Sequence, residues 1–459
     1  MEEIGEITES TTSSFIFKAK KDVEKHQYVR VNNVLAQVWE IKQLSNGMFA
    51  HARIIGSEER KYMPKSPFKV GSIVYETDEE FVRKIIGIEK EGIYIGMLKD
   101  SRIKVNLSPD ILIQKHICVL AKSGGGKSYA MGVVVEEFIK KGIPVVIIDP
   151  HGEYVSLRRP NLEKQEMESM KRFGIKPRGY AKNVYEFAPV CSNNREAIPL
   201  YLDETNLSFQ DLLNLLPHAT SQQKGVLYEA YKKARERKFY FLKDILEAIG
   251  ESKSNAKWNL LPQMEQIISM NLFSLHYTPL NEMVKKGVCS IINLRGVPPY
   301  IQEILVSILL TKLFDARRND AIPPFMVVIE EAHRYAPERG QGRSFATEII
   351  RTIASEGRKF GMGLAVVSQR AARVDKNVLS QCNTHMVLKT TNPNDLKAIV
   401  ASVEGLDSSA ANEIQMLPVG IAIVAGLPLA APIFVEIRTR ETLHGGKLNK
   451  ETKTRRFFV

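Results

Sequence analysis

A glycine-rich segment at residues 121–128, AKSGGGKS, contains the residue types that hold a phosphate chain. Three consecutive glycines let the backbone curl so that several N–H groups point at one anion. Lys127 would then reach the outer phosphates of a nucleotide, and the Ser128 hydroxyl would bind Mg²⁺. The segment predicts a site for ATP and Mg²⁺, with a plain turn between a strand and a helix as the alternative. The residues expected around the nucleotide here are Ala121, Lys122, Ser123, Gly124, Gly125, Gly126, Lys127, Ser128 and Tyr129.

A pair of carboxylates follows an apolar run in the segment FMVVIEEAHRY. The run predicts a buried strand that delivers Glu330 and Glu331 at its carboxyl end, where open α/β sheets bind ligands. Glu330 would act on Mg²⁺ through water, and Glu331 would polarise the attacking water as the catalytic base. The alternative for such a pair is a solvated strand edge, but the glycine-rich segment upstream favours the functional interpretation.

Two further strand ends add polar groups to the same edge. The segment IIDPHGEY places Asp149 and His151 after the strand that follows the glycine-rich loop and its helix. The alternative there is an ordinary Asp-Pro turn. The segment AVVSQR places Gln369 where it could sense the γ-phosphate or position water.

An arginine that neutralises developing charge would complete a phosphoryl-transfer site. The expected helix IIRTIASEGRKFG carries Arg351 and Arg358, seven residues apart and so on roughly one face. Either could reach a neighbouring subunit's nucleotide, and both could instead be surface arginines. Arg358, just before the Gln369 strand, is the preferred candidate.

The pattern of strands and helices that must position these residues predicts an α/β protein with a mostly parallel sheet. Short β-branched runs predict a small N-terminal β-barrel or sandwich, and apolar residues at helical spacing predict a helical insertion between two parts of the core. An antiparallel pair is expected at the end of the sheet, because residues 426–432 are too few for a helix. The expected divisions are a β domain over 1–100, the first core part over 101–160, the insertion over 161–285, the second core part over 286–440 and a basic tail over 441–459.

Composition narrows the class of protein. The apolar fraction of 44% is that of a soluble globular protein, and no apolar run approaches the roughly 20 residues that span a bilayer. The acidic N-terminus is unlike a secretory signal, so we expect a cytoplasmic protein without a membrane partner. The four cysteines form no CxxC pair, which favours buried thiols over a metal or disulfide framework. A net charge of +12 suits an anionic polymer as partner.

Taken together, the motifs resemble those of the HerA family of hexameric DNA translocases, within the wider HerA–FtsK group of P-loop ATPases. The resemblance rests on AKSGGGKS, IDPHGEY, VVIEEAHRYAP and ASEGRKFGMGLAVVSQR, and it covers nearly the whole chain. It implies a RecA-like core and a homo-hexamer that threads double-stranded DNA. It also implies a NurA-type nuclease partner that meets the N-terminal barrel, with both proteins acting in DNA end resection for recombinational repair.

A translocase must hold DNA phosphates without reading bases, so its contacts should be basic. Two loops at the expected strand ends supply such residues, although exposed solubilising charge is the alternative for each one. The candidates are Arg334, Arg339 and Arg343 in HRYAPERGQGR, and Arg370, Arg373 and Lys376 in QRAARVDKN.

Two other functions fit part of the pattern. A conjugation- or secretion-type coupling ATPase would share the core, but IDPHGEY and the N-terminal β domain argue against it. A nucleotide-gated DNA clamp with little hydrolysis would not need the Glu330–Glu331 pair.

Overall fold

The computed structural model describes residues 2–58, 64–216 and 219–445. Its N-terminal part is a closed barrel with the strand order β1-β2-β5-β4-β3-β6. The alternating apolar residues of these strands fill the barrel, with Phe17, Val29 and Ala50 fully buried. The strands are β1 (Glu3–Ser10), β2 (Ser14–Ala19), β3 (Tyr28–Val31), β4 (Val34–Leu44), β5 (Gly47–Ser57) and β6 (Ile73–Glu76).

The centre of the molecule is a 12-stranded sheet with the order β12-β11-β15-β10-β16-β17-β9-β18-β19-β20-β7-β8. The pairs from β12 to β18 are parallel, and those from β18 to β8 are antiparallel. The expected antiparallel pair is thus confirmed as β19–β20. The strands are β7 (Ile93–Leu98), β8 (Lys104–Leu107), β9 (Ile117–Leu120), β10 (Val145–Asp149), β11 (Val184–Ala188), β12 (Ile198–Pro199), β15 (Cys289–Asn293), β16 (Phe325–Glu330), β17 (Met362–Ser368), β18 (Thr384–Val387), β19 (Ile421–Gly426) and β20 (Ile433–Ile437).

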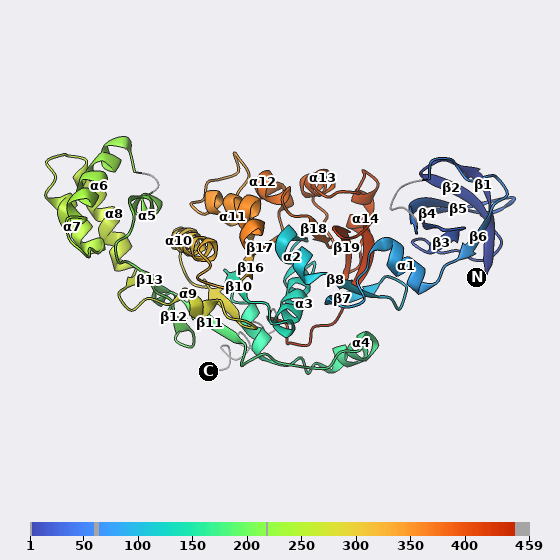
Figure 1. Ribbon diagram of the computed structural model, residues 1–459, viewed down its shortest axis with the longest axis horizontal. Helices are drawn as coiled ribbons and strands as arrows, with labels where there is room; N and C mark the ends of the chain where they lie inside the picture. The colour runs from blue at the N-terminus through green and yellow to red at the C-terminus, as the bar shows by residue number, and fades with distance from the viewer. Residues whose placement is uncertain (1, 59–63, 217–218, 446–459) are drawn as a thin grey trace, which may run out of the picture.

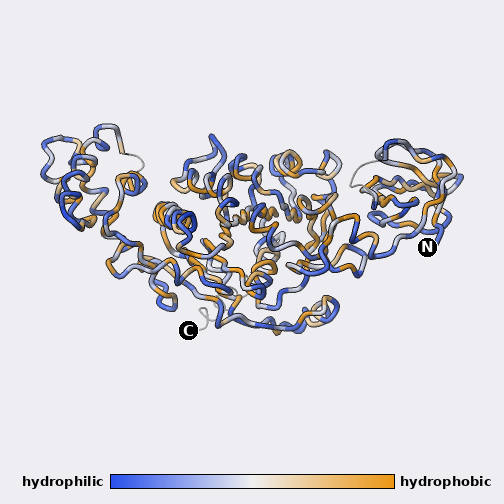
Figure 2. The backbone as a smooth tube through the Cα atoms, viewed as in Figure 1, coloured by the Kyte–Doolittle hydropathy of each residue, from blue (hydrophilic) through white to orange (hydrophobic). Residues whose placement is uncertain are grey.

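Helices cover both faces of this sheet because its central strands are apolar on both sides. Val145 and Ile147 of β10 pack in one core with helix α3 (Lys127–Lys140), and Val146 and Ile148 pack in another with helices α10 (Pro299–Arg318) and α11 (Thr347–Phe360). Figure 2 shows hydrophobic residues gathered along the central strands and hydrophilic ones along the outer loops. The other helices around the sheet are α1 (Glu79–Ile86), α2 (Pro109–Lys115), α4 (Met167–Phe173), α9 (Leu280–Met283), α12 (Lys376–Leu379), α13 (Pro393–Ser402) and α14 (Ala410–Met416).

The barrel and a group of helices lie at opposite ends of the molecule, with the sheet between them (Figure 1). The barrel contacts the antiparallel side of the sheet, where Arg53 Nη2 lies 3.0 Å from Asp407 Oδ2 and the rings of His26 and Phe434 lie 4.1 Å apart. The distal helices are α5 (Phe209–Leu215), α6 (Ser221–Ala234), α7 (Leu242–Gly250) and α8 (Lys257–Ser269), beside the short pair β13 (Leu202–Asp203) and β14 (Phe273–Ser274). Among the described residues, no helix has both the length and the apolar character needed to cross a bilayer.

Three expected divisions of the chain need correction. Residues 93–98, assigned to the N-terminal β domain, form β7, which pairs with β20 in the large sheet. The expected helical insertion over 161–285 contains β11, which pairs with β15 in the same sheet. The expected tail begins too early at 441, because Glu441 and Thr442 are buried; its remainder, 446–459, lies outside the described residues.

Candidate active site

The glycine-rich loop joins β9 to the first turn of α3, as the sequence predicts. Gly124 and Gly126 have φ of +72° and +95°, in the left-handed region that favours glycine. A Cβ at Gly125 would lie 3.0 Å from the Lys122 carbonyl oxygen and 3.1 Å from Ala121 Cβ, so the loop closes on itself there. Ala121 is therefore part of the loop's packed interior, which explains why a small residue serves in place of glycine.

The end of β16 places two carboxylates over the lysine of this loop. Lys127 Nζ lies 3.0 Å from Glu331 Oε1 and 3.5 Å from Glu330 Oε2. Glu331 adopts φ +52°, a left-handed conformation that turns the chain sharply where the strand ends. Both glutamates are 3% exposed, whereas the Lys127 side chain keeps 14% of its surface exposed, so the two ion pairs are shielded from water on the side of the glutamates.

Each of the two carboxylates keeps one oxygen without a hydrogen-bond donor. Tyr154 donates its hydroxyl to Glu330 Oε1, whereas Glu330 Oε2 and Glu331 Oε2 are buried and accept no hydrogen bond. His333 Nδ1 lies 3.3 Å from Glu331 Oε2 and 3.1 Å from the Ser368 hydroxyl. Buried carboxylate oxygens that accept no hydrogen bond are costly even with a cation or imidazole nearby, so they mark a place built to receive a ligand.

Burial and neighbouring charge set the protonation of this cluster. Burial raises the pKa of Glu330 above its usual value, although Lys127 and the Tyr154 hydroxyl oppose the change. Burial disfavours charge on Lys127, but Glu330 and Glu331 outweigh it and raise the pKa of the ammonium. Burial lowers the pKa of His333, which favours a neutral imidazole beside Glu331.

Asp149 shapes the neighbouring loop instead of lining the cavity. Its Oδ1 accepts the N–H groups of His151 (3.1 Å) and Gly152 (2.8 Å), and its Oδ2 accepts that of Tyr154 (3.0 Å). Burial raises the pKa of Asp149 to about 7, and these backbone donors act in the opposite direction. The Asp-Pro turn considered as the alternative is thus what the structure contains. The turn directs His151 and Glu153 to the cavity and brings the Tyr154 hydroxyl to Glu330.

The two arginines of α11 lie in different settings. Arg351 is held within its own chain, with Nη2 2.6 Å from Asp375 Oδ2 and Nη1 2.6 Å from Glu348 Oε1. Arg358 is exposed near the end of α11, close enough to His116 for its charge to lower that pKa. His116 precedes β9, so Arg358 lies toward the amino edge of the sheet, opposite its own glycine-rich loop.

The two basic loops lie side by side at the carboxyl edge. Pro337 and Val374 form a β-bridge, the Glu338 N–H donates to the Arg373 carbonyl (2.9 Å), and the Asp375 N–H donates to the Ala336 carbonyl (2.9 Å). Glu331 opens the first loop and Gln369 precedes the second. The six candidate DNA contacts are all exposed: Arg334, Arg339, Arg343, Arg370, Arg373 and Lys376.

A cavity of about 970 Å³ extends from the glycine-rich loop. Of the residues predicted around the nucleotide and its Mg²⁺, Ala121, Lys122, Gly125, Asp149 and Glu330 do not line it. Those that do are Ser123, Gly124, Gly126, Lys127, Ser128, Tyr129, His151, Glu331 and Gln369. Sequence reasoning assigned no role to Tyr154 and His333, although both belong to the motifs IDPHGEY and VVIEEAHRYAP. It also missed the wall formed by residues 165–173 and 437–444, for which no local pattern gives a signal.

Solved structures share this architecture. VirB4 of Thermoanaerobacter pseudethanolicus has a TM-score of 0.55 and 16% identity, over 76% of this chain and 97% of that one. The plasmid coupling protein TrwB in complex with a GTP analogue has a TM-score of 0.54 and 13% identity, over 80% and 94%. At these identities the likeness concerns the fold alone. With the glycine-rich loop and the carboxylates after β16, the fold is that of a RecA-like P-loop ATPase core.

Sequence relatives specify the family. A family described as "Helicase HerA, central domain" matches residues 93–313. The chain is 26% identical to the "Probable DNA double-strand break repair helicase HerA" of Methanocaldococcus jannaschii, over 96% of both chains. It is 28% identical to the "DNA double-strand break repair helicase HerA" of Saccharolobus solfataricus, over 88% of this chain and 81% of that one. The chain is therefore similar to members of the HerA family over most of its length.

Proposed function

We propose that this chain is an ATP-driven translocase of double-stranded DNA. The observation that carries the proposal is the position of the Glu330–Glu331 pair. The two carboxylates form ion pairs with Lys127. The backbone that follows Glu331 enters the first of the two adjoining basic loops directly. Groups suited to hydrolysing ATP and to contacting DNA phosphates are therefore joined by short stretches of backbone at one edge of the sheet.

Nucleotide binding would change the partner of Lys127. Its ammonium now forms an ion pair with Glu331, and the triphosphate would compete for it through charge-assisted hydrogen bonds. Glu331, released from Lys127, would then be available to polarise water. Because Lys127 leaves Glu331 only when the nucleotide binds, Glu331 would act as a base only when ATP is in the site.

The residues present also fit Mg²⁺. Glu330 Oε2 is buried without a donor, and Ser128, buried at the first turn of α3, supplies a hydroxyl. Oxygen ligands of this kind, together with phosphate oxygens, are what Mg²⁺ prefers. The bound ion would neutralise charge on the phosphates. Tyr154 fixes the orientation of the Glu330 carboxylate by holding its other oxygen.

Hydrolysis would require Glu331 to accept a proton from the attacking water, with Gln369 at the cavity wall orienting that water. Arg358 cannot serve its own site from the opposite edge of the sheet, so we assign it to a neighbouring subunit's nucleotide. This assignment is consistent with a homo-hexamer, the assembly implied by the resemblance to the HerA family. Arg351, already paired with Asp375, is assigned a structural role.

The relatives named as DNA double-strand break repair helicases support a role in DNA repair. We propose that the chain works with a NurA-type nuclease in end resection and that the barrel of β1–β6 is the face that meets it. The barrel suits this role because it lies at one end of the molecule, with few elements of the core around it (Figure 1).

A triplex-displacement assay tests translocation. A fluorescent third strand is annealed to linear duplex DNA, and the purified chain is added with ATP or with a non-hydrolysable analogue. We expect ATP-dependent displacement by the wild-type chain. Glu331→Gln should bind duplex DNA and ATP and displace nothing. Glu356→Gln, which alters an exposed carboxylate on α11, is the matched control and should displace normally.

The outcomes separate the alternatives. A wild-type chain that binds ATP and DNA without displacement would contradict translocation and favour a nucleotide-gated clamp. Negative-stain images of the same sample test the assembly, since a homo-hexamer should give sixfold rings with a central channel.

A further inference from the structure

The cavity extends well beyond the groups that would hold phosphates. On that far side its lining comes from three distant parts of the chain: α3, a peripheral segment (residues 159–181) and a C-terminal strap (residues 438–445). Figure 1 shows the peripheral segment leaving β10, passing beneath the sheet to α4 and returning to β11. The lining residues contributed by these parts are Tyr129 and Ala130, then Gln165, Glu166, Ser169 and Phe173, then Thr439 and His444.

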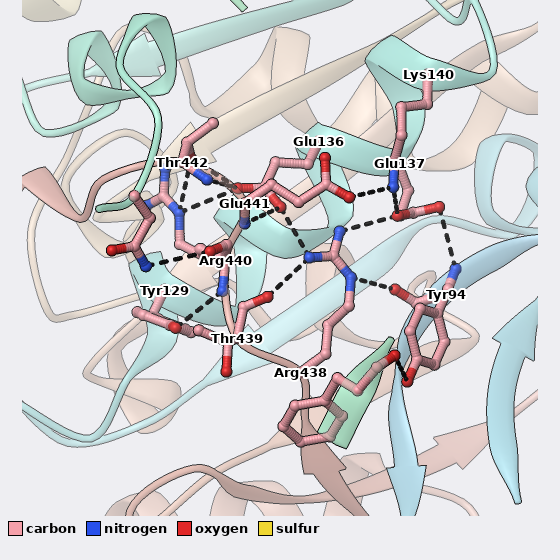
Figure 3. A network of polar contacts seen from close by, with 12 residues as sticks. Tyr94, Tyr129, Glu136, Glu137, Lys140, Arg438, Thr439, Arg440, Glu441 and Thr442 are labelled. Carbon is pink, nitrogen blue, oxygen red and sulfur yellow. Dashed lines mark hydrogen bonds and ion pairs between the residues drawn. The ribbon is translucent and has the colours of Figure 1, made fainter. Parts of the chain in front are cut away.

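A buried ion network fastens the strap to α3 (Figure 3). Arg438, which is 0% exposed, donates Nη1 to Glu136 Oε2 (2.9 Å) and Nη2 to Glu137 Oε1 (2.8 Å). Glu136 also accepts the N–H groups of Glu441 (3.1 Å) and Thr442 (2.9 Å). Burial disfavours charge on Arg438, but Glu136 and Glu137 outweigh it and hold the pKa of the guanidinium above its usual value. The strap is thus anchored on the helix that begins at the phosphate loop.

Tyr129, the residue directly after Ser128, joins the three parts of this wall. Its hydroxyl accepts the Arg440 N–H (2.9 Å) and donates to Glu166 Oε2 (3.2 Å). The Arg440 guanidinium crosses α3 where Gly132 leaves room, because a Cβ there would lie 2.7 Å from Arg440 Cζ. The position of the Tyr129 ring therefore depends on the strap and on the peripheral segment.

The strap continues from this wall toward the phosphate side. Its Leu443 N–H donates to the Arg159 carbonyl (2.9 Å), and its Glu441 carbonyl accepts the N–H groups of Asn161 and Arg178 (both 2.9 Å). Gly445 lies against the backbone of Glu153, since a Cβ there would be 2.0 Å from the Glu153 carbonyl oxygen. The strap thus runs from the wall beside Tyr129 to the loop that carries Glu153, another residue of the cavity lining.

Two aromatic rings face each other at this wall. The rings of Tyr129 and His444 lie 5.4 Å apart at 67°, and both residues are half-buried and line the cavity. The rest of the lining combines apolar residues with charged and polar ones. The apolar residues are Phe173, Pro418, Val419, Ile421 and Ile437, and the charged and polar ones include Lys99, Asp100, Glu166, Ser169 and Glu436. Two aromatic rings with apolar neighbours suit the flat faces of a nucleobase, and nearby polar groups could contact its edge.

We propose that this wall is a nucleoside subsite in which the base of ATP packs against Tyr129 and His444, and that the anchored strap sets its geometry. The proposal rests on the proposed function, because it takes ATP as the ligand of the phosphate loop. It assigns a specificity-determining role to a strap about 300 residues from the loop in sequence.

The test compares the affinity of ATP with that of inorganic tripolyphosphate, which offers the phosphates without a nucleoside. Isothermal titration is carried out on the full chain with Mg²⁺ present. His444→Ala should weaken ATP about tenfold, the scale of one lost base–aromatic contact, and leave tripolyphosphate unchanged. His276→Ala, an exposed histidine on the distal helical side, is the matched control and should change neither affinity.

A second pair of variants isolates the ring of Tyr129. Tyr129→Phe keeps the ring but loses the hydroxyl's bonds to Arg440 and Glu166, so its affinity for ATP should fall less than that of Tyr129→Leu. Tyr129→Leu should lose about tenfold, with tripolyphosphate again unaffected. Unchanged ATP affinity in His444→Ala and Tyr129→Leu would overturn the subsite. Equal losses for ATP and tripolyphosphate would also overturn it, since they would place the effect at the phosphate loop. A wild-type chain that binds neither ligand would instead refute the proposed function.

Discussion

Two clusters of buried charge contact the same helix, α3, and they differ in how completely their polar atoms are hydrogen-bonded. At its first turn, Lys127 meets Glu330 and Glu331, whose Oε2 atoms accept no hydrogen bond. Near its other end, Glu136 and Glu137 meet Arg438, and the described residues leave none of their buried polar atoms without a partner. Sequence composition does not separate the two, since each combines a pair of adjacent glutamates with a cation.

This difference in hydrogen bonding indicates which cluster binds a ligand and which one stabilises the fold. A buried charge is tolerated when every lone pair and proton is satisfied, as around Arg438. A cluster that keeps unsatisfied oxygens bears a cost that a ligand would relieve, as around Lys127. We therefore expect changes in the first cluster to alter catalysis and changes in the second to alter stability.

The largest expected effect is the loss of catalysis in Lys127→Ala. Removing the ammonium should lower ATP turnover by a factor of about 1,000 or more, because positioning and charge neutralisation provide most of the catalysis in phosphoryl transfer. Steady-state phosphate release measures it. Lys141→Ala, which alters an exposed lysine just after the same helix, is the control. Retention of more than a tenth of wild-type turnover by Lys127→Ala would contradict the comparison.

The next effect concerns stability. Arg438→Met removes the fully buried cation that Glu136 and Glu137 share, and leaves only Arg440 near Glu136 (3.6 Å) and Lys140 near Glu137. Breaking this buried network should cost about 3 kcal/mol. A lower Tm and faster hydrogen exchange in the strap and α3 would report it. Arg172→Met removes an exposed partner of Glu436 and should cost at most about 1 kcal/mol. Equal losses of Tm in Arg438→Met and Arg172→Met would show that burying the ion network adds nothing to its contribution to stability.

A third buried group, the imidazole of His116, can make both of its hydrogen bonds only when it is neutral. His116 Nδ1 accepts the Leu364 N–H (3.0 Å) and Nε2 faces the Ala354 carbonyl (3.0 Å), which requires a neutral ring. Burial lowers its pKa from 6.5 to about 4. Because the unfolded chain binds the proton more tightly, stability should fall by about 3 kcal/mol as pH drops from about 6.5 to about 4.

Hydrogen exchange at the Leu364 amide, corrected for the intrinsic rate, measures this loss. His116→Gln should reduce the acid sensitivity, and His276→Gln, at an exposed position, should leave it unchanged. Protection that stays constant down to pH 4 in the wild-type chain would be inconsistent with a neutral buried ring.

The smallest expected effect lies outside both clusters, in the basic loops. Arg373→Ala removes one exposed cation and should weaken duplex binding a few-fold, while reducing the slope of log affinity against log salt by about 1. Fluorescence anisotropy over a salt series measures both quantities. Arg318→Ala, an exposed arginine at the end of α10, should leave the slope unchanged. A slope that is also unchanged in Arg373→Ala would remove that residue from the DNA-contact set.

The first cluster could be predicted from sequence because its parts are local. The glycines fix the loop before Lys127, and an apolar strand of standard length must deliver Glu330 and Glu331 at its end. The second cluster could not be predicted in the same way. Arg438 and Glu136 lie 302 positions apart, and only the antiparallel register of β20 brings them together.

Two strands were misassigned for related reasons. The pattern of residues 93–98 indicates a strand but not its partner, so β7 looked like a continuation of the barrel. Glu186 interrupts the apolar run of β11. In the structure this residue is buried and accepts hydrogen bonds from Asn293 (2.7 Å) and Asn194 (2.8 Å), two partners that no local pattern announces.

The central claim is that the incomplete cluster at Lys127, Glu330 and Glu331 hydrolyses ATP in response to DNA. Phosphate release by the wild-type chain and by Glu331→Gln, each with and without duplex DNA, tests it most directly. We predict that duplex DNA stimulates the wild-type rate, and that Glu331→Gln binds ATP but hydrolyses it at least about 100-fold more slowly. Normal turnover in Glu331→Gln, or a wild-type rate that duplex DNA does not change, would contradict the account.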